Sequence, residues 1–494
     1  MRALSIIQEK YHLSLYGEAN PMGQAEIISL DQVRATHHLS QLRQHLHACF
    51  DQWLDTLVPY LDDTPMKLSD LTTVMWQLRQ ELMGGLTETV IDYTHTSEAE
   101  QTQTECPSCD RTLTVRRQSR RTVETLIGPV ELKRPYFYCT TCREGFYPLD
   151  TSLEVVASRY QVDVQQAIAK LCAETPYETA HALLGDLSGI EVSIERMHTL
   201  TNALADGLSV LDVAPDADEI RAQIRTLQAG KRRRPVMVLA IDGAHVPTRP
   251  DEAGEVIDAP KRHRARRAPW KGGYKEAKGL RLYAFDDERI VHVLSWHQVQ
   301  EDDAIGEALD HIKKSGLIPE DDVRLCVVGD GAPWIWNQIQ SRFPQARQVL
   351  DYYHCCERIH RVSVSLYGQG LKALEWAETT LTRLYHGEVS SVIGGLKRMR
   401  SRSAEAAHEI AKLIDYLDDH RHRTTYENLR RGGYPLGSGG IESANKFISH
   451  VRLKRSGAWW DVSNSNHILA LRCAKYNGTF DRVVQRHRER LVAG

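Results

Sequence analysis

Three carboxylates stand where a divalent cation could be held. Asp242 follows the apolar run PVMVLAI, Asp330 follows RLCVVG, and each is followed directly by glycine. Glu442 comes just after the glycine-rich stretch 437–440. A strand-end aspartate is often only a cap or a turn former. A carboxylate at the end of a buried strand is nevertheless costly unless a cation neutralises it.

The three acids together indicate phosphoryl-transfer chemistry. Such a set could hold two divalent cations about 4 Å apart, one activating water or a 3'-hydroxyl and the other stabilising the leaving oxygen. Hard oxygen ligands favour Mg²⁺ or Mn²⁺ over zinc. Basic residues near the acids would then bind the phosphate backbone of a nucleic acid.

Cations and aromatic residues near these acids are candidate nucleic-acid contacts. They are Lys446, Arg452, Lys454 and Arg455, the pair Trp459 and Trp460, and, in the cationic stretch 261–281, Arg264, Arg266, Arg267 and Lys271. The tryptophans could stack on an unpaired base, although paired tryptophans are more often core residues.

Four cysteines form two CxxC pairs, Cys106 with Cys109 and Cys139 with Cys142. Each pair can direct two thiolates at one ion, and two pairs complete the four-sulfur shell of structural zinc. The long spacer between the pairs is strand-like and predicts an extra hairpin. The sequence therefore predicts a zinc ribbon over 101–150, and its arginines make a nucleic-acid surface plausible beside the simpler alternative of a solvated face.

The elements that must position the acids follow an α/β order. A strand ending in Asp242, a hairpin, a strand ending in Asp330, a helix, a short strand ending in Asp351 and another helix succeed one another. Polar groups then collect at the carboxyl ends of the central strands, where chemistry tends to lie. The stretch 358–432 has only helical patterns and predicts a helical insertion before the segment of Glu442.

The remaining segments are helical. Residues 1–100 predict a helical region for oligomerisation or DNA binding, and 151–230 predict a helix-turn-helix-like segment. In the latter, Ser193 would cap a second helix that presents Arg196, although any helical hairpin has this pattern. The predicted core therefore comprises 231–357, the insertion 358–432 and the closing part 433–494.

Composition sets further bounds. The chain has 494 residues, a formal net charge of -3 and ten cysteines, of which four are in the CxxC pairs. This cysteine usage suits a reducing compartment with one metal site better than a disulfide framework. The sequence contains no long apolar run or leader pattern, so we expect a cytoplasmic, nucleoid-associated protein with no membrane partner.

Several segments together resemble one known family. The chain resembles bacterial insertion-sequence transposases of the DDE type, in the Kra-type group related to the Mutator superfamily. The matching segments lie between about 106 and 485 and read CPSC, LIGPVELKRPYFYCTTC, YPLD, AIDGAHV, VVGDGAPWIW, LDYYHCCERI, GYPLGSGGIESANKFI, RLKRSGAWW and LALRCAKYNGTFDRV.

The resemblance implies an RNase H-like catalytic core with an all-helical insertion. It implies that Asp242, Asp330 and Glu442 are the metal-binding triad, and that Asp351 and His354 form an acid-x-x-His signature beside it. A simpler role for His354 is that of a helix N-terminal residue hydrogen-bonded to Asp351.

The resemblance further implies an enzyme of DNA recombination. It would bind terminal inverted repeats of double-stranded DNA as a homodimer or larger homo-oligomer, cut the 3' ends and join them to target DNA. Its cofactors would be two Mg²⁺ or Mn²⁺ ions per active site and one structural Zn²⁺. The alternatives are a DNA-binding repressor or domesticated inactive derivative, and an RNase H-like nuclease that does not transpose DNA.

Overall fold

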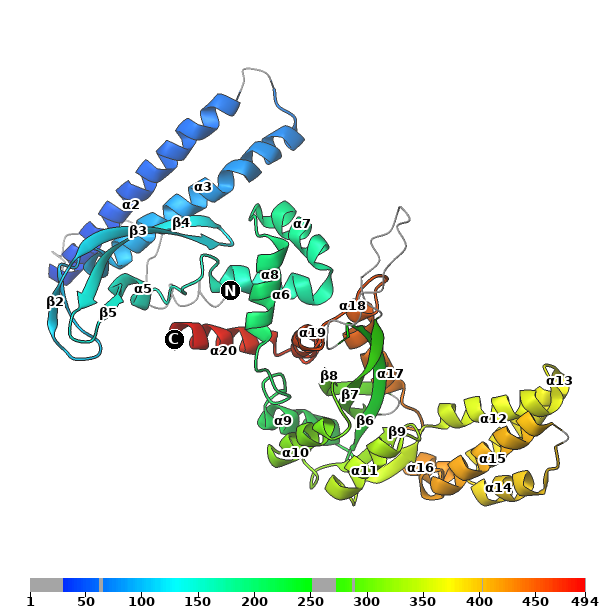
Figure 1. Cartoon of the computed structure of the whole chain (residues 1–494). Coiled ribbons are helices and arrows are strands. Elements are labelled where there is room, and N and C mark those ends of the chain that lie inside the picture. Colours follow the sequence, from blue (N-terminus) through cyan, green and yellow to red (C-terminus); the bar gives the residue numbers. More distant parts are fainter. Residues whose placement is uncertain (1–29, 62–64, 251–271, 287–288, 402, 494) are drawn as a thin grey trace, which may run out of the picture. The chain divides into compact units, whose positions relative to one another are not determined.

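The computed structural model describes residues 30–61, 65–250, 272–286, 289–401 and 403–493. It divides into two compact units, Met1–Gln101 and Thr102–Gly494. Helices and several β-sheets confirm the predicted multidomain α/β class (Figure 1). Within the described residues, no helix has both the length and the apolar character needed to cross a membrane.

The first unit is a pair of long helices. Helix α2 (Leu30–Leu57) packs against α3 (Leu68–Thr94), and the short helices η1 (Val58–Tyr60) and α4 (Thr96–Ala99) follow them. Its small core contains Trp53, Leu57 and Leu78. The indole N–H of Trp53 donates to the Leu78 carbonyl at 3.0 Å, so the tryptophan fixes the pairing of the two helices.

The second unit begins with short strands and a hairpin. Strands β1 (Gln103–Glu105) and β2 (Thr112–Thr114) form one antiparallel sheet. Strands β3 (Arg117–Thr125), β4 (Gly128–Cys139) and β5 (Glu144–Phe146) form a second one, in the order β3-β4-β5. The hairpin of β3 and β4 is the extra hairpin expected between the CxxC pairs, and α5 (Pro148–Ser152) follows it.

Three helices with their own core come next. They are α6 (Val162–Glu174), α7 (Tyr177–Ser188) and α8 (Ile194–Ala205). Helix α7 ends at Gly189, whose positive φ of 72° suits a residue without a Cβ. Ser193 caps α8, because its hydroxyl accepts the N–H of Arg196 at 3.2 Å. Helix α9 (Ala217–Gln228) then leads to the central sheet.

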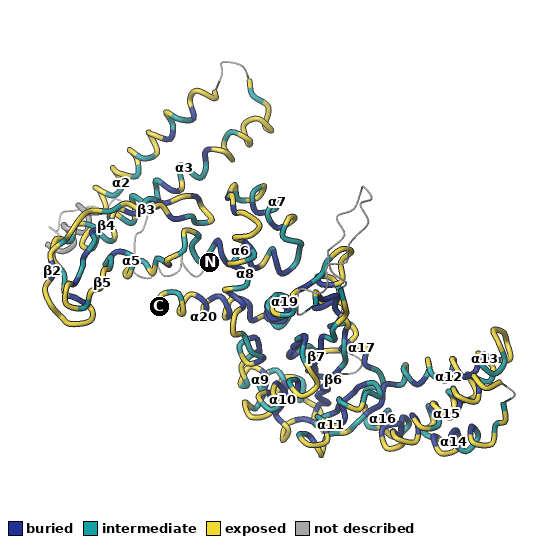
Figure 2. The backbone as a smooth tube through the Cα atoms, viewed as in Figure 1, coloured by how far each residue is buried: buried dark blue, intermediate teal, exposed yellow. Residues whose placement is uncertain are grey.

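The central sheet has five strands in the order β10-β9-β6-β7-β8. Strands β6 (Val236–Thr248), β7 (Gly273–Asp286) and β8 (Arg289–Val299) form an antiparallel meander, and β9 (Arg324–Gly329) and β10 (Arg347–Leu350) are parallel to β6. Most of β6 and much of β7 are buried, as Figure 2 shows. Asp242 was expected to end its strand, but β6 continues past it to Thr248 because β7 goes on pairing with it.

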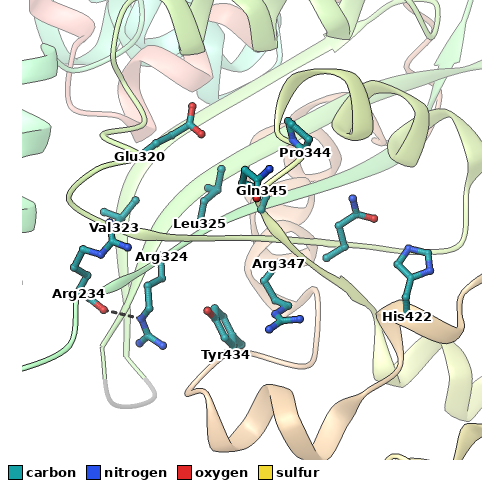
Figure 3. A pocket seen from close by; sticks show the side chains of 12 residues that line it. Arg234, Glu320, Val323, Arg324, Leu325, Pro344, Gln345, Arg347, His422 and Tyr434 are labelled. Atoms are coloured by element: carbon teal, nitrogen blue, oxygen red, sulfur yellow. Dashed lines mark hydrogen bonds between the residues drawn. The ribbon is translucent and has the colours of Figure 1, made fainter.

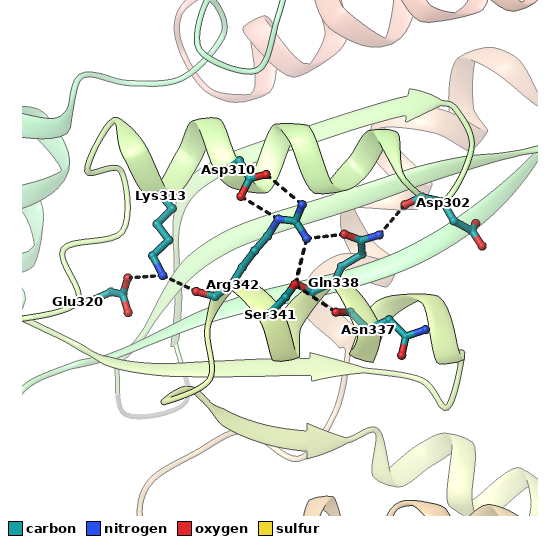
Figure 4. Close-up of polar contacts among 8 residues, drawn as sticks. All are labelled: Asp302, Asp310, Lys313, Glu320, Asn337, Gln338, Ser341 and Arg342. Carbon is teal, nitrogen blue, oxygen red and sulfur yellow. Dashed lines mark hydrogen bonds and ion pairs between the residues drawn. The ribbon is translucent and has the colours of Figure 1, made fainter.

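Helices α10 (Ala304–Lys314) and α11 (Pro333–Arg342) lie beside the sheet and are tied together by Arg342 (Figure 4). Its guanidinium donates two hydrogen bonds of 2.9 Å to the carboxylate of Asp310 and one of 2.6 Å to the Gln338 side chain. Such a forked pair fixes both distance and orientation, so it locks α11 beside α10. The segment that carries Asp330 leads directly into α11.

The part of the chain between β10 and the Glu442 segment consists, where described, of helices only. They are α12 (Tyr352–Tyr367), α13 (Leu371–Tyr385), α14 (Val389–Arg398), α15 (Ala404–Asp419), η2 (Arg421–Arg423) and α16 (Tyr426–Arg431). The chain closes with α17 (Gly439–Ala444), the π-helical turn η3 (Asn445–His450), α18 (Val451–Leu453), α19 (Val462–Tyr476) and α20 (Phe480–Ala493). Helix α17 lies against β6 and β7, and this contact brings Glu442 to the sheet.

Candidate functional site

Three aspartates stand in one row across the parallel strands, with Asp242 inside β6 and with Asp330 and Asp351 directly after β9 and β10. The β6–β9 ladder pairs Ala240 with Val328, so the residues two positions further on, Asp242 and Asp330, are opposite one another. The β9–β10 ladder ends at Gly329 and Leu350, which places Asp351 next to Asp330 in the same way. Laterally equivalent residues direct their side chains to the same face of a sheet. The strands thus assemble an acidic row from three distant sequence segments.

Ser438 connects Glu442 to this row. Its backbone N–H donates a short hydrogen bond to the buried Asp351 carboxylate, and its hydroxyl donates to Glu442 Oε1 at 2.8 Å. Gly440 allows this approach, because a Cβ there would lie 2.6 Å from the Tyr283 ring. The glycine-rich stretch therefore lets the start of α17 lie close to the sheet.

Asn445 holds Asp242 at the other end of the same helical segment. Its side-chain amide donates to Asp242 Oδ2 at 2.7 Å, and its oxygen lies 2.9 Å from Nε2 of His297. An ionised carboxylate only accepts, so the amide nitrogen must face Asp242 and the amide oxygen must face the histidine. Nε2 of His297 consequently carries a proton. Burial lowers the pKa of His297 to about 4, so this ring is neutral and can act as a fixed donor.

Asn445 is also the first residue of the π-helical turn η3. Such wide turns are rare and are frequent at functional sites. Sequence reasoning missed Asn445, Ser438 and His297. A single asparagine or serine in a helical segment has no distinctive spacing, and only the fold brings these residues to the acids.

The pKa of Asp242 is raised from 3.8 to about 6. Burial is the largest cause, and the charges of Asp330 and Glu442 add to it. The N–H of Gly243, which donates to Oδ1 at 2.8 Å, and the charge of His354 oppose the rise. These influences place the three acids and His354 within one electrostatic environment. A cation bound there would relieve the repulsion.

The ligand atoms of Asp242, Asp330 and Glu442 lie further from one another than the thiols of the four cysteines do. Among the described residues, the four cysteines are the group whose ligand atoms all lie within 4.8 Å of one another. Asp242, Asp330 and Glu442 do not converge to that distance. A single tetrahedral ion would need closer ligands, whereas two ions about 4 Å apart are held by carboxylates that spread around them. The oxygen-only set fits hard cations of that kind.

Asp351 and His354 have different surroundings. Asp351 is fully buried and caps α12, accepting the backbone N–H of His354 at 2.9 Å. It is the backbone of His354, not its ring, that makes this bond. The ring is partly exposed and lies 3.7 Å from Glu357. Asp351 therefore positions α12 and Ser438, while the His354 imidazole remains accessible beside the acids.

The four cysteines of the ribbon could hold a structural metal ion such as zinc. The Sγ atoms of Cys106 and Cys142 are 3.9 Å apart, and those of Cys109 and Cys139 are 3.7 Å apart. Thiolates about 2.3 Å from a tetrahedral zinc ion lie about 3.8 Å from one another, so the spacing fits this ion. Asp110 and Arg143, which follow the two CxxC pairs, both have positive φ, of 57° and 61°. The two halves of the site thus share one backbone geometry.

Two predicted DNA contacts are wrong. Arg452 is buried, donates to the Cys172 carbonyl at 2.9 Å and lies over the Trp460 ring, so it cannot reach a phosphate. Trp460 is also buried, and its indole N–H donates to the Leu453 carbonyl at 3.1 Å. It also joins the end of β6 through backbone bonds to Pro247 and Arg249. Both residues form the core that anchors the closing helices.

The other candidate contacts keep accessible side chains where they are described. Lys446, Lys454, Arg455 and Arg196 are exposed. Trp459 is half-buried beside Tyr274, at a centroid distance of 6.0 Å. Arg264, Arg266, Arg267 and Lys271 lie outside the described residues.

Within the ribbon, two of the arginines serve the fold. Arg121 donates to the carbonyls of Val156, Ala157 and Ser158, and Arg134 is paired with Asp150. These two cations are therefore committed to joining the hairpin to the segment that follows it. The exposed Arg116, Arg117, Arg120 and Lys133 would have to make any contact with nucleic acid.

Comparison with known proteins gives a family. A search of curated proteins found no match. The family model described as Uncharacterised protein family (UPF0236) matches residues 61–490, which includes the ribbon, the acidic row and the insertion. The chain therefore belongs to the UPF0236 family.

Proposed function

We propose that this protein is a DDE-type transposase of a bacterial insertion sequence. It would bind terminal inverted repeats, cleave DNA to expose 3'-hydroxyls and join these ends to target DNA. The observation that supports this most is the register of Asp242 and Asp330 on neighbouring parallel strands, with Glu442 brought to the same edge by α17.

The sheet supports an RNase H-like core. An antiparallel meander of β6, β7 and β8 is followed by two strands parallel to β6, and the order is β8-β7-β6-β9-β10. The helical insertion lies between the last of these strands and the helix with Glu442. Both features are those that the resemblance to DDE transposases leads us to expect.

In this proposal Asp242, Asp330 and Glu442 hold two Mg²⁺ or Mn²⁺ ions. When bound, such ions activate the attacking oxygen and stabilise the leaving oxygen of an in-line phosphoryl transfer. The protein's own residues position the ligands. Asn445 orients Asp242, Ser438 orients Glu442, and the Ala332 N–H, 2.8 Å from Asp330 Oδ1, orients the third carboxylate.

His354 would act at the periphery of the same site. Its partly exposed ring is close enough to influence Asp242 electrostatically. Its proposed role is to donate a hydrogen bond to a phosphate oxygen. Asp351, which is fully buried, would act only by positioning the start of α12 and Ser438.

A strand-transfer assay tests the proposal. Labelled, pre-cleaved element ends are incubated with a supercoiled target in Mg²⁺, with wild type, Glu442→Gln and the matched control Glu375→Gln. Glu375 is an exposed residue of α13, so its variant should join DNA as wild type does. Joining by wild type and the control but not by Glu442→Gln is the expected result.

The other outcomes are equally informative. Joining by Glu442→Gln would remove Glu442 from the triad. Binding of ends without nicking or joining by wild type, in Mg²⁺ and in Mn²⁺, would instead favour a repressor or an inactive derivative. Cleavage without joining would favour a nuclease that does not transpose DNA.

A further inference from the structure

A cationic groove extends from the amino ends of β6, β9 and β10 to Tyr353 and Gly437, which are next to Asp351, and it has no role in the site described above. Two adjoining cavities of about 760 and 880 Å³ form it, and Arg234, Arg324 and Tyr434 line both. Figure 3 shows the first cavity, with Arg234, Arg324, Arg347 and Tyr434 around it. The second cavity extends along the segment 433–437 towards Ser438.

Positive charge dominates the groove. The cations that line it are Lys231, Arg232, Arg233, Arg234, Arg324, Arg347 and Arg430, and Glu320 is the one carboxylate among the described lining residues.

The arginines that have partners bond to backbone carbonyls rather than to acids. Arg234 donates to Asp321 O at 2.6 Å, Arg324 to Gly432 O at 2.6 Å, and Arg430 to Tyr385 O at 3.4 Å. A carbonyl fixes a guanidinium but does not neutralise its charge. The groove therefore attracts anions over its whole length.

Aromatic rings alternate with these cations. Arg324 lies over the Tyr434 ring at 5.2 Å, and Arg430 lies over the Tyr385 ring at 3.7 Å. At the end near the acids, Tyr353 is 64% exposed. A Cβ on Gly437 would lie 2.7 Å from the Tyr353 ring and 3.8 Å from Asp351 Oδ2, so this ring is adjacent to the acidic row.

We propose that this groove binds single-stranded DNA that extends from the acidic row. Arg232 and Arg233 contact consecutive phosphates, and the exposed Tyr353 ring stacks on the base nearest the acids. Grooves that bind single strands combine a line of cations along the backbone with aromatic surfaces for the bases. The proposed direction of the strand, away from the acids, rests on the proposed function, whereas the binding itself does not.

Binding of a labelled oligothymidylate tests the charges. Fluorescence anisotropy is measured in EDTA over a salt series, for wild type, for Arg232→Glu/Arg233→Glu and for the matched control Arg398→Glu/Arg400→Glu. All four arginines are exposed, and the control pair lies outside both cavities. Loss of two phosphate contacts should make the slope of log K against log salt shallower by about 1.4 and weaken binding at least tenfold. Equal weakening by both double variants would overturn the proposal.

Tyr353 gives a second, independent measurement. Tyr353→Ala should weaken binding of the same oligonucleotide at least about fivefold, whereas Tyr353→Phe should bind as wild type does, because stacking on a base needs only the ring. Unchanged binding by Tyr353→Ala would overturn the stacking role. Circular dichroism of each variant confirms that the fold is retained.

Failure of the groove and failure of the proposed function are distinguishable. The binding assay is run in EDTA, so its outcome does not depend on metal chemistry at the acidic row. If wild type joins no DNA but Arg232→Glu/Arg233→Glu still loses strand binding, the groove stands and the transposase proposal fails. If wild type joins DNA while this variant binds oligothymidylate normally, the groove proposal is overturned.

Discussion

Folding disfavours the ionised form of the Asp242 carboxyl group. Burial raises its pKa to about 6, so in the metal-free protein the folded state binds a proton more tightly than the unfolded chain does. This contribution to stability is fully present below the unfolded pKa near 3.8 and is lost as the pH rises through about 6. Metal ions compete with that proton, so their affinity has the opposite dependence on pH.

We therefore expect Mn²⁺ affinity to fall about tenfold for each pH unit below about 6 and to be nearly constant above 7. Isothermal titration calorimetry from pH 5 to 8 measures this. Asp242→Asn, which has no titrating carboxyl group, should bind Mn²⁺ weakly at every pH. A constant wild-type affinity between pH 5 and 7 would contradict the role of Asp242.

Asn445 is a positioning residue whose removal should alter the same titration. Without its hydrogen bond, the ionised form of Asp242 loses a donor and its pKa rises further. Asn445→Ala should lower strand transfer about 10-fold to 100-fold and move the acid limb of the pH profile to higher pH.

Asn466→Ala is the matched control for Asn445→Ala. Asn466 bonds both backbone groups of Val299, at 2.8 and 3.1 Å, so its variant should lower stability without moving the acid limb. If the two variants moved the limb equally, Asn445 would have only a structural role.

At the scale of elements, the position of α17 depends on a close approach at Gly440. The missing Cβ would lie 2.6 Å from the Tyr283 ring, whereas a Cβ on the neighbouring Gly439 would meet nothing within 4 Å. Gly440→Ala should lower the free energy of unfolding by about 1 to 3 kcal/mol, because α17 or Tyr283 must move. Gly439→Ala should be neutral or stabilise the helix by up to about 1 kcal/mol. Urea denaturation compares the two, and equal effects would contradict the argument.

The apolar core of the zinc-ribbon segment is too small to stabilise its fold by itself. Leu113 and Phe137 are buried there together with Cys106 and Cys139, and little else joins them. A metal ion should supply much of the folding free energy of such a small unit. We expect Cys139→Ser to lose zinc and to become sensitive to proteolysis within 102–147. Cys356→Ser, outside the cluster, should retain both zinc and resistance, and a stable metal-free ribbon would contradict the prediction.

Local patterns explain which elements could be predicted from the sequence. The apolar runs before Asp242 and Asp330 predicted buried strands, and the CxxC spacing predicted the cysteine cluster, because both signals lie within a few residues. The continuation of β6 past the Asp-Gly pair could not be predicted, because it depends on pairing with β7. Arg452 was mistaken for a phosphate contact because its partner, the Cys172 carbonyl, is 280 residues away in the chain. Asn445 acquires its role only when the helix meets the sheet.

At the scale of the whole molecule, the proposed joining of two DNA ends would need two copies of the chain, and the first unit has a surface suited to pairing. On α3, Leu68, Leu71 and Met75 follow the heptad spacing that Leu78 continues. Leu78 is covered by α2, but the side chains of Leu68, Leu71 and Met75 are exposed. Leu68 is 76% exposed. A stripe of this kind favours pairing with a second copy.

We therefore expect the full chain to be a dimer or larger oligomer that depends on this stripe. Leu71→Glu/Met75→Glu should produce monomers in light scattering and should abolish joining of paired ends, because charges in an apolar seam oppose association. Thr73→Glu/Gln77→Glu adds the same charge to exposed positions on the opposite side of α3 and should leave the oligomer intact. A wild-type protein that is monomeric both alone and with end DNA would contradict this assignment. An oligomer that survives Leu71→Glu/Met75→Glu would instead place the interface outside α3.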